Sequence, residues 1–212
     1  MNKFFIEIFT SQNRSVDSES TENIIFNEKN LKVSFKEEKF CCHKPSKNNN
    51  YFILSSISSS DRKKIIKKYD FINIENSDSE ILLELYQKFG NKIFKIFGSS
   101  FFFFYFDFDN KNAFIARDHI GFNSIYYTKK EDSFFIFSSL NNLKKNCGKN
   151  LKINFKILKK FLNLDAFSKD QTFFEDILKL PPSSVLEYRD NSVSISSYPK
   201  FKDFTLSDSN TS

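Results

Sequence analysis

Residues 101–106 form an unbroken aromatic run, and this run constrains the fold more than any other stretch of the chain. Its length is typical of a strand, and a strand that is apolar on both faces must be covered on both. The run therefore predicts a strand inside a layered structure, where its phenylalanines pack in the core rather than bind a cofactor. The polar turn at 107–112 and the apolar segment 113–116 then predict a hairpin.

Shorter patterns predict further strands and several helices. Ser77 and Glu80 fit a capping box, and the apolar residues that follow recur at a helical period. Asp61 is the expected N-cap of an earlier helix. Strands are also predicted at 3–9, 23–26, 31–35, 51–54, 71–74, 124–128, 134–138, 183–188 and 193–197, and helices at 61–69, 79–89, 93–97 and 155–164. The last helix is expected to bury four apolar residues: Ile157, Leu158, Phe161 and Leu162. Two sheets with apolar faces that need cover by helices indicate a layered α+β domain.

Composition excludes several classes of function. The formal charge of +6 comes almost wholly from lysine, and the basic cluster at 62–68 is typical of the solvated face of a helix, so we expect no nucleic-acid partner. Cys41, Cys42 and Cys147 have no Cys-x-x-Cys spacing, which predicts neither a disulfide framework nor a metal site, and we expect no cofactor. No run reaches the roughly 18 apolar residues of a membrane helix, and the first residues are too charged for a signal peptide. We therefore expect no membrane partner and a cytoplasmic location.

Three motifs from residue 77 onward resemble those of one family. They are Ser-Asp-Ser-Glu at 77–80, Ala-Arg-Asp-His-Ile-Gly at 116–121 and Thr-Phe-Phe-Glu-Asp-Ile-Leu-Lys-Leu-Pro-Pro at 172–182. All three are similar to segments of class II glutamine amidotransferase domains, the last one to the asparagine synthetase branch. The resemblance implies one such domain at 1–200 and a polar tail at 201–212. It also implies a four-layer αββα sandwich of the N-terminal-nucleophile hydrolase type, with antiparallel sheets.

The same resemblance implies a reaction whose central residues do not occur here. In the family, an N-terminal cysteine attacks glutamine with its own α-amine as base, and the ammonia passes to a synthetase that activates aspartate with ATP. This chain starts with Met1 and Asn2, while Cys41 and Cys42 lie mid-chain without a free α-amine. The family's Asn-Gly oxyanion site falls at about 54–59, where neither residue occurs. We therefore expect no catalytic residue.

Four residues match the motifs of the family. Asp78 corresponds to the aspartate that binds the substrate α-amine, although an aspartate in a first helical turn also favours the helix dipole without any ligand, and we prefer this structural role. Arg117 and Asp118 are expected to form an ion pair that fixes the turn to Gly121, with contact to a partner as a second role. His119 is expected to be a surface turn residue.

Our first hypothesis is a domain that has lost glutamine hydrolysis and acts as a structural or partner subunit of an amide-forming, ATP-dependent synthetase. One alternative is an active glutamine-hydrolysing subunit of asparagine synthetase that supplies ammonia through an unrecognised nucleophile. The other is a module that binds a small ligand or a peptide in the former glutamine cleft. The expected partners are such a synthetase or a second copy of the chain, and the expected contact is an apolar face near Leu180, Pro181, Pro182 and Val185.

Overall fold

The aromatic run forms β6 (Phe101–Asp107), a central strand with antiparallel neighbours on both sides. Its phenylalanines alternate between the two faces of the sheet. Phe102, Phe104 and Phe106 pack toward the second sheet, whereas Phe101 and Phe103 pack toward the helices, and all five are almost fully buried. The predicted strand, its hairpin and the core role of the run are confirmed.

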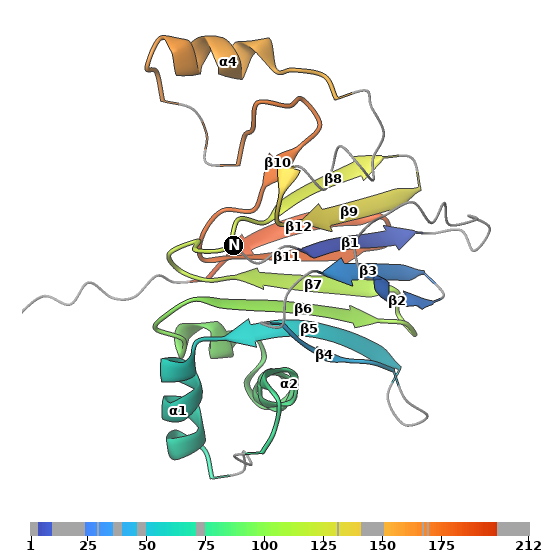
Figure 1. Ribbon diagram of the computed structural model, residues 1–212, viewed down its shortest axis with the longest axis vertical. Helices are drawn as coiled ribbons and strands as arrows, with labels where there is room; N and C mark the ends of the chain where they lie inside the picture. Colours follow the sequence, from blue (N-terminus) through green and yellow to red (C-terminus); the bar gives the residue numbers. More distant parts are fainter. Residues whose placement is uncertain are drawn as a thin grey trace, which may run out of the picture.

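Two six-stranded antiparallel sheets lie face to face (Figure 1). Sheet A contains, in order, β10 (Leu178–Lys179), β8 (Tyr126–Lys130), β9 (Ser133–Phe137), β1 (Phe4–Phe9), β3 (Leu31–Phe35) and β2 (Ile24–Glu28). Sheet B contains β12 (Ser192–Ser197), β11 (Ser184–Arg189), β7 (Asn112–Arg117), β6, β5 (Tyr51–Ile57) and β4 (Cys41–His43). This computed structural model describes residues 4–9, 24–28, 30–35, 40–45, 50–70, 75–130, 132–140, 151–166, 168 and 170–198.

Helices cover the outer face of sheet B. They are α1 (Ser59–Lys68), α2 (Asp78–Phe89) and the short 3-10 helix η1 (Gly90–Lys95), and their apolar residues join Phe101 and Phe103 in one core cluster. The predicted capping box is present, because Ser77 Oγ accepts the Glu80 N–H at 3.3 Å and the Glu80 carboxylate accepts the Ser77 N–H at 2.6 Å.

Among the described residues, a smaller cluster covers the outer face of sheet A. Phe5, Phe135 and Phe137 pack there against Ile177, which lies in the segment between α4 (Phe155–Leu162) and β10. The order of layers confirms the predicted α+β architecture with antiparallel sheets. No helix among the described residues is both long and apolar enough to span a membrane.

Helix α4 departs from the prediction in its burial. Ile157 is buried as expected and Leu158 is half-buried, but Phe161 and Leu162 are exposed. The helix stands away from the two sheets at the top of Figure 1, so only one edge of its apolar face meets the rest of the chain.

Smaller differences concern element ends. Helix α1 begins at Ser59 with Ser58 as its N-cap, and Asp61 lies inside the helix. Strands β4 and β10 were not predicted, because segments of three and two residues carry no periodic signal. The predicted strand at 71–74 and the polar tail at 201–212 lie outside the described residues.

Candidate functional site

Three strands bring the motif residues to one end of the sandwich. The ring centroid of Phe4, at the start of β1, lies 4.6 Å from that of Phe102, near the start of β6 in the facing sheet. Ile57, the last residue of β5, is paired with Phe101, and Arg117, the last residue of β7, is paired with Phe102. We call this end, marked by Phe4, Ile57 and Arg117, the amino end.

Asp78 lies at the amino end, where α2 begins beside the end of β5. Its Oδ2 accepts the Ile57 N–H at 3.0 Å, and its Oδ1 accepts a hydrogen bond from the Arg62 guanidinium at 2.7 Å. The same Arg62 contact is an ion pair. Both oxygens of the carboxylate therefore hold partners within the chain, and these partners join α1, α2 and β5.

A thiol lies close to this carboxylate. Cys41 is paired with Ser55 across β4 and β5, and the Ser55 hydroxyl donates to Ser79 Oγ at 3.1 Å. Burial raises the pKa of the Cys41 thiol above its ordinary value, and the nearby Asp78 carboxylate raises it further, although the Asp78 N–H and Arg62 oppose this. The thiol is therefore protonated at neutral pH, and a protonated thiol is a poor nucleophile.

Asp61 is a structural residue of this end that sequence reasoning misassigned. It is 2% exposed, and its carboxylate accepts the N–H groups of Gly98 and Ser99 at 3.3 and 2.8 Å. It therefore fixes the loop before β6 rather than capping α1. No sequence signal separates this role from an N-cap, because its partners are backbone groups 37 and 38 positions away.

Arg117 organises the turn that follows β7. Its side chain is fully buried and donates to three backbone carbonyls, those of Asn123 at 2.7 Å, Gly121 at 2.6 Å, and Leu180. Burial lowers the pKa of the guanidinium, while Asp118 opposes this shift. Gly121 has a φ of +70°, and a Cβ there would lie 2.8 Å from both Arg117 Nη2 and Pro182 Cγ. Glycine is thus the residue that fits this turn.

Asp118 fixes the same turn separately. Its Oδ1 accepts the N–H groups of Gly121 and Phe122 at 2.6 and 3.0 Å, and its buried Oδ2 has no hydrogen-bond partner among the described residues. The expected ion pair between Arg117 and Asp118 is thus replaced by two sets of backbone hydrogen bonds. Both residues serve the turn to Gly121, as the motif predicted, but through carbonyls and amides rather than through each other.

His119 is half-buried, not a free surface residue. Its Nδ1 lies 3.1 Å from Ser183 Oγ, and its Nε2 lies 3.1 Å from the carbonyl of Phe94. Ser183 is itself buried, so the two contacts of His119 link the turn to η1 and to the residue before β11. Across the described ranges, no three His, Cys, Asp or Glu side chains gather in a way that could hold a metal ion.

The glutamine amidotransferase domain family matches residues 62–199, which is well over half of the chain. The chain belongs to this family. The matched interval contains Arg62, Asp78, Arg117, Asp118 and Gly121, so every motif residue named above lies within the amidotransferase domain. Cys41 lies outside the matched interval.

Two solved structures resemble the amidotransferase domain at 10% sequence identity. An allosteric regulatory enzyme of purine biosynthesis aligns with a TM-score of 0.51, over 92% of this chain and 43% of that one. The glutamine phosphoribosylpyrophosphate amidotransferase from B. subtilis, complexed with ADP and GMP, aligns with a TM-score of 0.48, over 79% of this chain and 35% of that one. No curated protein sequence matches.

The first of these likenesses confirms the fold. The paired antiparallel sheets with their helical cover are the N-terminal-nucleophile hydrolase sandwich that the motifs implied. The amidotransferase domain spans less than half the length of either solved chain.

Proposed function

We propose that this amidotransferase domain does not hydrolyse glutamine and acts as a partner subunit of an amide-forming, ATP-dependent synthetase of the asparagine synthetase type, in the cytoplasm. The occupied carboxylate of Asp78 is the observation that carries this proposal. A substrate ammonium would have to compete with Arg62 and the Ile57 N–H, which already hold the two oxygens of Asp78 at 2.7 and 3.0 Å. A hydrogen bond to a charged group is worth about 1.5–3 kcal/mol, so the loss of either partner would oppose substrate binding.

The segment that would supply the oxyanion donors supports the same proposal. Ile57 donates its N–H to Asp78, and the Ser58 N–H donates to the carbonyl of Ser100 at 3.2 Å. Ser55 is fully buried against Ser79. These groups are engaged in holding the amino end together, and loss of one oxyanion donor already costs about a hundredfold or more in rate.

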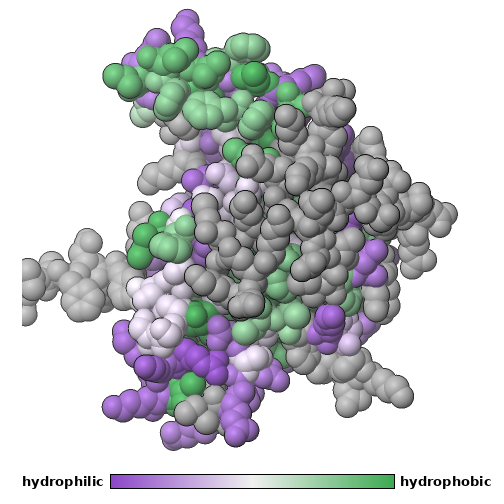
Figure 2. Space-filling model, viewed as in Figure 1, coloured by the Kyte–Doolittle hydropathy of each residue, from purple (hydrophilic) through white to green (hydrophobic). Residues whose placement is uncertain are grey.

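The exposed face of α4 supports the role of a partner subunit. Phe155 and Leu162 of α4 and Leu164 just after it are 72%, 70% and 94% exposed. Figure 2 shows hydrophobic residues gathered at the top, where α4 lies in the same view of Figure 1. Apolar surface of this kind marks contact sites. Of the four residues expected at a contact, Leu180 and Val185 are buried in the core, whereas Pro181 and Pro182 are half-buried.

The charge around this face favours a partner with an acidic rim. Lys156, Lys159 and Lys160 alternate with the apolar residues of α4, and the helix carries no acidic residue. A synthetase that buried the apolar residues would therefore meet a ring of lysines, which steer association more than they stabilise the complex.

An assay of glutamine hydrolysis tests the catalytic half of the proposal. Purified protein incubated with glutamine should release no glutamate above the buffer rate, in both the unmodified chain and the Cys41→Ala variant. Turnover in the unmodified chain that disappears in Cys41→Ala would instead support the active-subunit alternative. A Cys42→Ala variant is the matched control, since Cys42 is also a free half-buried thiol on β4.

A further inference from the structure

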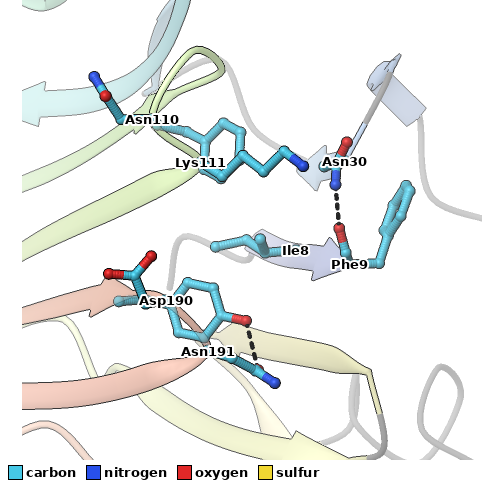
Figure 3. A pocket seen from close by; sticks show the side chains of 9 residues that line it. Ile8, Phe9, Asn30, Asn110, Lys111, Asp190 and Asn191 are labelled. Atoms are coloured by element: carbon cyan, nitrogen blue, oxygen red, sulfur yellow. Dashed lines mark hydrogen bonds between the residues drawn. The ribbon is translucent and has the colours of Figure 1, made fainter. Parts of the chain in front are cut away.

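A cavity of about 240 Å³ lies between the two sheets, at the end opposite Asp78. Ile8, near the end of β1, and Phe106, near the end of β6, line it, whereas the starts of the same strands mark the amino end (Figure 3). Tyr188 of β11 completes the apolar floor, and all three side chains are almost fully buried. The core cluster to which these three residues belong is rich in phenylalanine.

Two opposite charges stand on the rim of this cavity. Lys111 lies in the turn between β6 and β7, and Asp190 lies in the turn between β11 and β12. Both turns hold these residues at positive φ, +53° for Lys111 and +48° for Asp190. In Figure 3 the two side chains reach the cavity from separate walls, with Ile8 between them. Neither charge has an ion-pair partner in the described part of the chain.

The amides of the rim are oriented by the protein. The Asn30 amide nitrogen donates to the carbonyl of Phe9 at 2.7 Å, which fixes the orientation of the Asn30 amide. Asn191 Oδ1 accepts the Tyr188 hydroxyl at 3.0 Å, which leaves its amide nitrogen as a donor. These two hydrogen bonds fix the orientation of both amides at the rim.

We propose that this cavity binds a small zwitterion, an α-amino acid with an apolar side chain. Its carboxylate would pair with Lys111, its ammonium with Asp190, and its side chain would lie against Ile8, Phe106 and Tyr188. The volume of about 240 Å³ is below the roughly 300–1,000 Å³ of pockets for drug-sized ligands, which suits a molecule of amino-acid size. This site lies apart from Asp78 and does not depend on the fate of glutamine hydrolysis.

Calorimetric titration with four probes tests the proposal. L-Phenylalanine and L-leucine carry both charges, 3-phenylpropionate lacks the ammonium, and phenethylamine lacks the carboxylate. We expect saturable binding of both amino acids, and binding about tenfold weaker for each singly charged probe, since a lost charged pair is worth about one factor of ten.

Two variants test which charged residue of the rim binds which charged group of the ligand. Lys111→Met should weaken the binding of phenylalanine and 3-phenylpropionate about tenfold but leave the binding of phenethylamine unchanged. Asp190→Asn should weaken the binding of phenylalanine and phenethylamine about tenfold but leave that of 3-phenylpropionate unchanged. Asparagine tolerates the positive φ of position 190. Lys92→Met and Asp165→Asn, at exposed positions outside the cavity, are the matched controls and should change nothing.

Two outcomes would overturn the proposal. One is no saturable binding of either amino acid at millimolar concentration. The other is equal affinity for all four probes in the unmodified protein, which would show that the charges play no part. The comparison of probes uses the unmodified chain, so it decides the matter even if a variant fails to fold.

Discussion

At the scale of single residues, the turn after β7 is the most tightly determined part of the site. Arg117 crosses this turn with three carbonyl partners, and Gly121 leaves no room for a side chain between Arg117 and Pro182. The amidotransferase motif at these positions is therefore explained by packing and hydrogen bonding within the turn, without a ligand.

Gly121→Ala should destabilise the protein by about 4 kcal/mol, because backbone strain and overpacking each cost about 1–3 kcal/mol. Gly90→Ala is the matched control. Gly90 also has a positive φ, +57°, but nothing lies within 4 Å of its added Cβ, so only the strain of about 2 kcal/mol should appear. Urea denaturation measures both. An equal loss of stability in the two variants would show that Arg117 and Pro182 move aside for the added methyl group without an energetic penalty.

Tyr105 should make stability fall at high pH. Burial, helped by Asp107, raises its pKa to about 12. The unfolded tyrosine has a pKa of about 10, so the folded chain holds the proton more tightly. The stabilisation is complete below about pH 10 and is lost as pH rises to about 12. In urea denaturation between pH 10 and pH 12, the free energy of unfolding should fall less steeply with pH in Tyr105→Phe than in the unmodified protein. An unchanged slope would contradict the assignment.

At the scale of elements, α4 and β12 differ from the rest of the fold in what they leave exposed. Helix α4 buries Ile157 but exposes Phe155, Phe161 and Leu162. Strand β12 is an edge strand with all six residues exposed, and its sequence Ser-Val-Ser-Ile-Ser-Ser carries no charge. Exposed edges without charge are prone to pair with another strand.

Two substitutions in α4 separate its two sides. Ile157→Ala should cost about 2–4 kcal/mol of stability, because it removes a buried side chain. Leu162→Lys should change stability by less than about 0.5 kcal/mol, because the residue is already exposed, but it should weaken association of the chain. Chemical denaturation and sedimentation velocity measure the two effects. If Leu162→Lys destabilised the monomer as much as Ile157→Ala, the side chain of Leu162 would be packed in the monomer rather than exposed.

At the scale of the whole molecule, the exposed surfaces of α4 and β12 predict association. We expect the isolated chain to form dimers or larger species, or to bind a synthetase, and we expect this to persist at high salt because apolar contacts are not screened. Sedimentation velocity from 0.05 to 1 M salt measures it, with Ser194→Lys on β12 as a test of edge pairing. A monomer at every salt concentration that also fails to bind the synthetase would contradict the partner-subunit proposal.

Four features could be predicted from the sequence alone: the layered α+β class, the strand at 101–106, the capping box at Ser77 and Glu80, and the turn that ends at Gly121. Each of these depends on neighbours within a few positions, where periodicity and backbone conformation leave a visible pattern. The motifs around Asp78 and Arg117 identified the family from the same local signals.

The contacts that these residues make could not be predicted from the sequence, because most of them join distant segments. Asp61 accepts amides from a loop 37 and 38 positions away, Arg117 reaches Leu180, and Phe161 is exposed although it lies on the apolar side of a helix. A helical period shows which residues share a face, but not whether another element covers that face. Hydrogen bonds between distant segments likewise form only once the sheets have paired, and so they leave no pattern in the chain.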